Sequence, residues 1–265
     1  MPKTEVILFP TQNVVKKTTI NLFLVGFGKM GKIISENAHY ITGDIVAIYD
    51  PNIPEYCSLD RIDFDNIDVA IEFTHPESGY DNVKMLLDLN IPVVTGTTGW
   101  FHRVKELERL YNPEKHSLIY GANFSIGMNL MYKIVEESAK LINNTNLYDV
   151  YGFESHHRGK IDSPSGTAKV LADIILENNS SKDKAIYDLN NKTLKANEFS
   201  FSSIRAGNIV GYHEIGFDSD FDEIKLVHNA KNRRGFALGA LMAAKYAKEN
   251  KGFLNFKDIF RYLYT

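Results

Sequence analysis

Residues 18–31 read TTINLFLVGFGKMG, and this stretch decides the fold. Its first half, Thr18–Val25, is an apolar run rich in β-forming residues, which is typical of a buried strand. The run leads directly into a glycine-rich turn, and the next residues, KIISENAHY, have helical spacing. A strand, a glycine turn and a helix in this order form the setting that a dinucleotide-binding fingerprint requires.

Each glycine of the turn has a physical task in binding a dinucleotide. Gly26 permits the tight turn, Gly28 lets the backbone approach a pyrophosphate, and Gly31 lets the helix pack on the strand. The free N–H groups at the start of the helix attract the phosphates. The predicted cofactor-binding residues of this turn are Gly26, Phe27, Gly28, Lys29, Met30 and Gly31.

Asp50 follows the second predicted strand, about 20 residues after the turn, where an acid accepts hydrogen bonds from the ribose hydroxyls. We therefore predict a nicotinamide cofactor, NADH or NADPH. A carboxylate at this place disfavours a 2′-phosphate, so we expect a weak preference for NADH, although Lys29 could partly compensate. A purely structural glycine turn is the alternative.

Further apolar runs predict strands at 44–49, 67–73, 91–95 and 117–120, with helices at 78–90 and 101–111 between them. This alternation predicts an α/β fold with a Rossmann-type, doubly wound parallel sheet, because parallel strands need a crossover helix. Ligands bind at the carboxyl ends of such strands, which adds Gly96, Thr97 and Thr98 to the cofactor site. Ordinary turn chemistry is the other reading of that loop.

The pattern changes after residue 121. Helices are predicted at 127–142 and 167–178, and strands at 149–154, 198–201, 209–217 and 221–229 have short connections. These predict a second, α+β domain built on an open, mostly antiparallel sheet, and a closing helix at 236–248. We assign 18–121 plus 234–265 to the dinucleotide-binding domain, 122–233 to a substrate-binding and catalytic domain, and 1–17 to an N-terminal arm.

The composition of the 265 residues limits the classes of partner. A net charge of −3 with 24% charged residues gives no general basic surface for nucleic acid. The chain holds a single cysteine, Cys57, and no apolar run of about 20 residues or signal-peptide pattern. We therefore expect a cytoplasmic protein that binds neither nucleic acid nor membrane.

Residues 154–168, ESHHRGKIDSPSGTA, carry the strongest chemical signal. His156, His157 and Lys160 concentrate cationic donors, and Ser165-Gly166-Thr167 then begins a helix whose N–H groups also favour an anion. The histidines could be metal ligands, but no further ligands stand at zinc spacing, so we predict no metal. A polar surface loop with a helix cap is the other alternative.

The same stretch resembles the signature of the dihydrodipicolinate reductases, E-x-H-H-x-x-K-x-D-x-P-S-G-T-A. The resemblance extends to GANFSIGMN at 121–129, EFT at 72–74, GTTG at 96–99, RAGNIVGYH at 205–213 and RRGFALGA at 233–240. It therefore covers the chain from about Asn21 to the closing helix. The chain departs from the family where Gly121-Ala122 replaces Ala-Pro and Met128 replaces Val, and in its long N-terminal arm.

The resemblance implies a function. It implies that NADH or NADPH reduces a cyclic dicarboxylate imine, formed when 4-hydroxy-tetrahydrodipicolinate loses water, in lysine and diaminopimelate biosynthesis. His156 and Lys160 would be catalytic; His157, Ser165, Gly166, Thr167 and Arg233 would bind substrate; and Gly121, Ala122, Asn123 and Phe124 would join the cofactor site. It also implies a homotetramer. A reductase of another cyclic imine carboxylate and a non-catalytic nucleotide-sensing protein are the alternatives.

Overall fold

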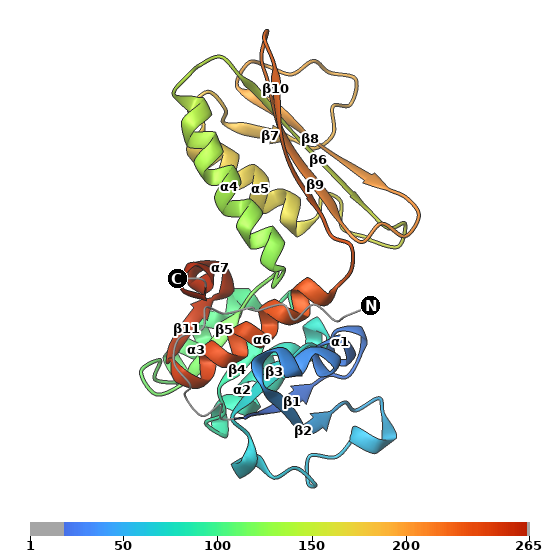
Figure 1. The fold of residues 1–265 in the computed structure, drawn as a ribbon, viewed down its shortest axis with the longest axis vertical. Helices are drawn as coiled ribbons and strands as arrows, with labels where there is room; N and C mark the ends of the chain where they lie inside the picture. The colour runs from blue at the N-terminus through green and yellow to red at the C-terminus, as the bar shows by residue number, and fades with distance from the viewer. Residues whose placement is uncertain (1–18, 264–265) are drawn as a thin grey trace, which may run out of the picture. The chain divides into compact units, whose positions relative to one another are not determined.

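Figure 1 shows the computed structural model of the chain, which describes residues 19–263. The predicted N-terminal arm, 1–17, lies outside the described residues. The described residues divide into two compact units, one formed by residues 19–124 together with 236–263, the other by Ser125–Gly235. The assignment of cofactor and substrate to separate domains stays a prediction.

The first unit is built on a six-stranded sheet in the order β11-β5-β4-β3-β1-β2. All its pairings are parallel, and the sheet reverses its direction of growth between β1 and β3, which confirms the Rossmann-type architecture. Its strands are β1 (Ile20–Val25), β2 (Gly43–Tyr49), β3 (Val69–Glu72), β4 (Val93–Thr95), β5 (Ser117–Tyr120) and β11 (Gly252–Asn255).

Helices surround this sheet in Figure 1. They are α1 (Lys29–Asn37), α2 (Pro76–Asp88), α3 (Val104–Leu110), α6 (Arg234–Glu249) and α7 (Phe256–Ile259), with short 3-10 helices at Ala38–Ile41, Pro54–Tyr56, Phe64–Asn66, Phe101–Arg103 and Phe260–Leu263. Val83, Leu86 and Leu87 of α2 have helical spacing and pack with Phe23, Val25 and Val93 of the strands in one apolar cluster. Burial of this face fixes the helices against the sheet.

The second unit holds a five-stranded mixed sheet in the order β10-β9-β6-β8-β7. Its strands are β6 (Asp149–His156), β7 (Lys184–Ile186), β8 (Glu198–Arg205), β9 (Tyr212–Asp218) and β10 (Glu223–Asn229). The predicted antiparallel pairing holds for β6, β9 and β10, whereas β8 pairs in parallel with both β6 and β7. The connection from β6 passes through a helix before the chain returns, and such a crossover makes the strands parallel.

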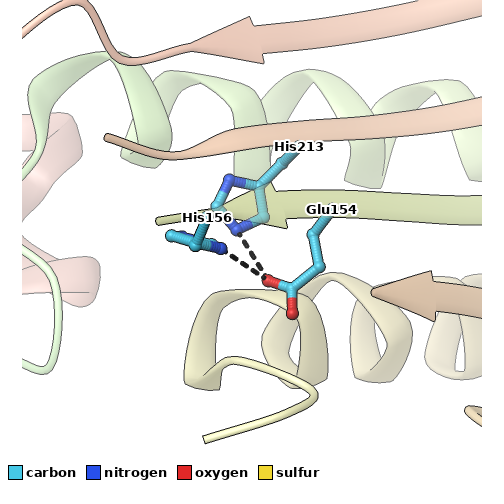
Figure 2. A group of neighbouring side chains, drawn as sticks. All are labelled: Glu154, His156 and His213. Carbon is cyan, nitrogen blue, oxygen red and sulfur yellow. Dashed lines mark ion pairs between the residues drawn. The ribbon is translucent and has the colours of Figure 1, made fainter. Parts of the chain in front are cut away.

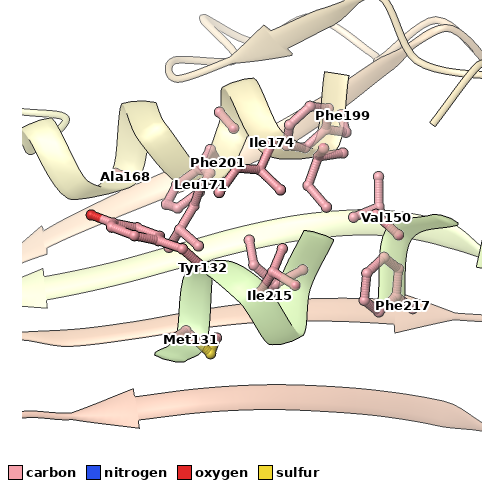
Figure 3. Packing of buried hydrophobic residues seen from close by; sticks show 14 of the residues in the cluster. Met131, Tyr132, Val150, Ala168, Leu171, Ile174, Phe199, Phe201, Ile215 and Phe217 are labelled. Atoms are coloured by element: carbon pink, nitrogen blue, oxygen red, sulfur yellow. The ribbon is translucent and has the colours of Figure 1, made fainter. Parts of the chain in front are cut away.

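Two helices, α4 (Ile126–Asn143) and α5 (Gly166–Asn178), pack on one face of this sheet (Figure 3). Side chains alternate along a strand, so Val150 on β6, Phe199 and Phe201 on β8, and Ile215 and Phe217 on β9 all point to that face. They meet Tyr132 and Leu171 of the helices. This inner face is the core of the unit.

Within residues 19–263, none of the helices combines the length and the apolar character that a membrane span needs.

We expect Phe201→Ala to lower the free energy of unfolding by about 3–5 kcal/mol, because it opens a cavity in a fully buried site. Phe221 is 79% exposed, so Phe221→Ala should change the stability by less than about 0.5 kcal/mol. Urea titration followed by circular dichroism measures both. Equal stabilities of the two variants would contradict the described core.

Candidate active site

The predicted cofactor residues of the first unit gather at the carboxyl edge of its sheet. Gly26–Gly31 follow β1, Asp50 follows β2, Gly96–Thr98 follow β4 and Gly121–Phe124 follow β5. Because all these strands are parallel, their carboxyl ends lie at the same edge. The structure thus brings together segments that are up to about a hundred residues apart in the sequence, as the fold predicts.

The turn after β1 has a backbone that only glycine adopts easily. Gly26 has φ +93°, and a Cβ atom there would collide with the carbonyl oxygen of Phe73. Gly28 is different, because a Cβ atom there would meet nothing within 4 Å. Gly28 is exposed and forms the N-cap of α1. Packing therefore explains the first glycine, whereas the open space beside the second fits the approach of a dinucleotide phosphate.

Asp50 is bound to the same turn. Its Oδ2 accepts a hydrogen bond of 2.8 Å from the Phe27 N–H, and its Oδ1 accepts one of 3.0 Å from the Asn52 N–H. Partial burial raises the pKa of Asp50, but these backbone hydrogen bonds outweigh it, so the pKa lies below its ordinary value. The side chain is therefore a fixed anion beside the glycine turn.

A buried carboxyl group joins the ends of β3 and β4. Glu72 is 0% exposed; its Oε2 accepts a hydrogen bond of 2.5 Å from Thr95, and its Oε1 accepts one of 2.8 Å from Thr97. The Thr74 hydroxyl also donates to Oε1. Burial raises the pKa of Glu72 above its usual value, against the effect of these hydroxyls. The predicted residue Thr97 is thus held inward, while Thr98 is exposed.

The loop after β5 also combines a buried residue with more exposed ones. Phe124 is 2% exposed and packs its ring against Phe73 and Phe256, with ring centres 5.9 and 4.5 Å away. Ala122 is exposed and Asn123 half-buried. Phe124 is therefore part of the packing at this edge, and Ala122 and Asn123 are the residues beside it that a ligand could reach.

In the second unit, the inner face of the sheet changes from apolar to polar along β6. Val150, Gly152, Glu154 and His156 alternate on this face, and all are buried. Glu154 lies opposite His213 on β9 and Ser203 on β8. The apolar half packs on the helices, and the polar half lies where α5 begins, because Ser165 contacts Glu154.

Glu154 is the centre of this polar half (Figure 2). Its Oε2 lies 3.3 Å from His156 Nδ1 and 3.4 Å from His213 Nε2, and the Ser165 hydroxyl donates to the same oxygen. Its Oε1 accepts hydrogen bonds from Arg205 Nη2 at 2.9 Å, from the Ser165 N–H at 2.9 Å and from the Ser203 hydroxyl at 2.8 Å. The carboxylate is therefore surrounded by donors on both oxygens.

These contacts set the charges of the cluster. Burial alone would raise the pKa of Glu154, but the two histidines and Ser165 lower it far below its ordinary range. Burial lowers the pKa of His213, and the nearby His156 acts in the same direction although Glu154 opposes it. Glu154 is thus an anion, and His213 is neutral near pH 7.

The helix α5 begins with an open turn beside this cluster. Ser165 is its N-cap and accepts a hydrogen bond of 3.1 Å from the Ala168 N–H. Gly166 is exposed, and a Cβ atom there would meet nothing within 4 Å. Of the predicted substrate-binding residues, Ser165 is therefore occupied with Glu154 and the cap, and Gly166 offers free space; Thr167 is half-buried.

The cations of the loop are already partly neutralised. Lys160 lies 2.7 Å from Asp162 Oδ1, and Arg205 donates to the Asp162 carbonyl oxygen at 2.6 Å. His157 is half-buried, and Arg233 is exposed in the bend before α6. His156 and Lys160 lie in the same strand–loop segment, whereas Arg233 is separated from it in the sequence, and its role stays a prediction.

Glu154, His156 and His213 also form a group whose possible metal-ligand atoms lie within 4.8 Å of one another. Zinc uses such ligands. However, Arg205 and Ser165 already bind the carboxylate, and a guanidinium group opposes a second cation. We therefore interpret the group as a hydrogen-bonded charge cluster, and the absence of a metal stays a prediction.

Sequence reasoning gave no role to Glu72, Glu154, Arg205 or His213. A signal for Glu154 was present, because the pattern V-x-G-x-E-x-H at 150–156 places a charged residue on the inward side of a strand. The contributions of Arg205 and His213 depend on strand pairing, which the local sequence does not specify.

Comparisons with known proteins agree with this arrangement. The family model described as the N-terminus of dihydrodipicolinate reductase matches residues 20–124, and the model for its C-terminus matches residues 127–260. The 4-hydroxy-tetrahydrodipicolinate reductase of Christiangramia forsetii is 36% identical over 240 residues, covering 91% of this chain and 97% of that protein. A second such reductase, from Buchnera aphidicola, is 37% identical and covers 76% of this chain and 75% of its own.

Among solved structures, the dipicolinate-bound dihydrodipicolinate reductase of a Paenisporosarcina species superposes with a TM-score of 0.73 at 25% identity. The match covers 91% of this chain and all of that one. An amine dehydrogenase from Mycobacterium smegmatis, at 9% identity and a TM-score of 0.58, shares the fold alone.

The two glycines of the turn should respond differently to alanine. We expect Gly28→Ala to keep the stability of the wild type but to weaken NADH binding by about tenfold or more, because a methyl group fills the space for the phosphates. Gly26→Ala should destabilise the fold itself. Fluorescence titration with NADH and urea unfolding measure the two effects, and unchanged NADH binding by Gly28→Ala would count against this cofactor site.

Proposed function

Because the chain belongs to the dihydrodipicolinate reductase family, we propose that it reduces the dehydrated form of 4-hydroxy-tetrahydrodipicolinate to tetrahydrodipicolinate with NADH or NADPH. The reaction serves lysine and diaminopimelate biosynthesis. The nicotinamide supplies a hydride when bound, and the protein supplies a proton and the fixed cations for two carboxylates. One observation carries the proposal: a dinucleotide turn with an acid at Asp50 and the 154–168 signature occur in one chain.

The second unit supports binding of a dicarboxylate. The N-terminus of α5 at Gly166 and Thr167 is partly open, and its N–H groups favour an anion. His157 and Lys160 precede it in the same loop. The related Paenisporosarcina reductase binds dipicolinate, a planar dicarboxylate. In the proposed site, His157, Ser165, Gly166, Thr167 and Arg233 bind the substrate.

The proposed proton donors are His156 and Lys160. Both lie in the segment that leads from β6 to α5, so they share one side of the unit with the proposed carboxylate site. The ammonium group of Lys160 is paired with Asp162, so a substrate carboxylate would have to compete with Asp162 for it. The cofactor site would comprise the turn after β1, Asp50 and the loops after β4 and β5.

We further propose a cytoplasmic homotetramer. Both helices of the second unit cover the inner face of its sheet, so the outer face has no helix from this unit over it. That face carries Tyr151, Phe153 and Tyr212, with Ile204 at 48% and Val227 at 49% exposure. Apolar side chains on an uncovered sheet are suited to subunit contact. Light scattering with size-exclusion chromatography measures the assembly.

A direct assay separates the proposal from its alternatives. Hydroxy-tetrahydrodipicolinate, generated enzymatically, is supplied with NADH or NADPH, and the nicotinamide absorbance is followed. A fall that depends on both substrate and protein supports the reductase. Oxidation with another cyclic imine carboxylate but not with this one would indicate a different substrate, and binding of NADH without turnover would indicate a sensor.

We expect His156→Gln and Lys160→Met each to lower kcat by about 100-fold or more, the scale for removing a general acid. His157→Gln should mainly raise KM, because uniform binding is lost. NADH affinity should be unchanged in all three, since the glycine turn lies in the other unit. Steady-state kinetics measures kcat and KM for each variant. Near-normal turnover of Lys160→Met would contradict its role as a proton donor and leave it as a residue that binds a substrate carboxylate.

Cofactor preference should depend on Asp50. We expect a higher kcat/KM with NADH than with NADPH, because the ionised carboxylate repels a 2′-phosphate. Asp50→Ala should reduce the ratio of kcat/KM with NADH to kcat/KM with NADPH by about tenfold, which corresponds to the loss of ~1.4 kcal/mol of repulsion. Asp44→Ala, which removes an exposed charge from β2, the strand that Asp50 follows, is the matched control. A strong wild-type preference for NADPH would contradict the assignment.

A further inference from the structure

We propose that Glu154 is a positioning residue that fixes opposite tautomers in two histidines, with the proton of His156 on Nδ1 and that of His213 on Nε2. The arrangement leaves Nε2 of His156 as the atom that exchanges a proton with the substrate. This last statement rests on the proposed function. The tautomers themselves follow from the geometry of the cluster.

One oxygen atom contacts a different ring nitrogen in each histidine. Oε2 of Glu154 lies 3.3 Å from Nδ1 of His156 but 3.4 Å from Nε2 of His213 (Figure 2). An ionised carboxylate only accepts, so a nitrogen that faces it is favourable when it carries hydrogen and repulsive when it presents a lone pair. The same anion therefore selects Nδ1–H in one ring and Nε2–H in the other.

The charge of Glu154 does not depend on the histidines alone. Arg205 and the Ser203 hydroxyl donate to Oε1, and Ser165 donates to both oxygens through its backbone and side chain. Because a carboxylate in the interior needs such donors to remain ionised, the cluster keeps its anion at neutral pH. Nδ1 of His156 lies close to Oε2 of Glu154 without a well-directed hydrogen bond, so the effect of the carboxylate on this ring is mainly electrostatic.

Burial excludes the reverse tautomer of His213. Its Nδ1 is sealed from solvent and has no hydrogen-bond partner. A proton there would be a buried donor without an acceptor, whereas Nδ1 of His156 has Oε2 of Glu154 3.3 Å away; Nε2 of His213 would also turn a lone pair toward Glu154. His213 therefore holds a single proton on Nε2, which agrees with its neutral state.

The two nitrogens of His156 have different surroundings. Nδ1 is sealed from solvent, so it cannot meet a substrate. Nε2 faces the backbone of Gly211, where an added Cβ atom would lie 3.1 Å away. When the imidazolium protonates the substrate, the bond from Nε2 to hydrogen breaks, its electron pair stays on nitrogen, and the neutral ring keeps its proton on Nδ1. The hydride comes from the nicotinamide.

Nuclear magnetic resonance on the full-length, 15N-histidine-labelled protein tests the tautomers without any assay. At about pH 8.5, well above the ordinary histidine pKa, two-bond 1H–15N spectra distinguish the two forms. Signals are assigned with His156→Gln and His213→Gln. We expect Nδ1–H for His156 and Nε2–H for His213. An Nε2–H form of His156 in the wild type would overturn the proposal even if the protein is an active reductase.

Variants of Glu154 test the cause. Glu154→Gln should shift His156 toward Nε2–H, the form that histidine favours in water, and lower kcat by about 100-fold with a smaller change in KM. Glu154→Asp keeps the charge and should retain more turnover and more of the Nδ1–H form. Glu137→Gln, which removes an exposed carboxylate from α4, is the control. An unchanged His156 tautomer in Glu154→Gln would contradict the role of the carboxylate.

Gly211→Ala gives a second route should Glu154→Gln fail to fold. The added methyl group would lie 3.1 Å from Nε2 of His156, and it removes none of the donors and acceptors around Glu154. We expect a loss of kcat of about tenfold or more with both tautomers preserved. Preserved tautomers with full turnover would show that Nε2 is not the reacting nitrogen.

Discussion

Compensation of buried negative charge at the ends of strands is the constraint on which both units depend. Glu72 and Glu154 are each fully buried, and a carboxylate in the interior is unfavourable unless it is protonated or surrounded by donors. Hydroxyl groups surround Glu72, and its pKa is raised. A guanidinium group and two histidines surround Glu154, and its pKa is lowered. The same residue type therefore gives a group that tolerates a proton in one unit and a fixed anion in the other.

Each carboxyl group also adds side-chain hydrogen bonds or ion pairs between segments that are neighbours in the fold. Glu72 ties the loop after β4 to the end of β3 through Thr97 and Thr74. Glu154 ties β6 to β8, to β9 and to the first turn of α5. The polar residues of the proposed site are therefore placed by a charge that must be satisfied, and the apolar half of the same sheet face supplies the stability.

The sequence predicted those parts of the fold that local patterns specify. The glycine turn after LFLV, the buried strands and the long helix α4 follow from residue spacing, and all are present. The short strands β7 and β11 were missed because they are only partly buried and begin with Lys184 and Gly252, whereas the equally short β3, β4 and β5 lie in buried apolar runs. The charge cluster was also missed, because Ser165, Arg205 and His213 reach Glu154 only through pairing between distant strands and a helix.

The inserted position of the second unit has a consequence for synthesis on the ribosome. The first sheet is closed by β11, which pairs with β5 although more than a hundred residues separate the two strands. All residues of the second unit, Ser125–Gly235, leave the ribosome before α6 and β11 do. At that point all residues of the second unit are outside the ribosome, whereas the sheet of the first unit still lacks β11. Its strand β5 is then an unpaired edge. That edge therefore stays unpaired until β11 has left the ribosome.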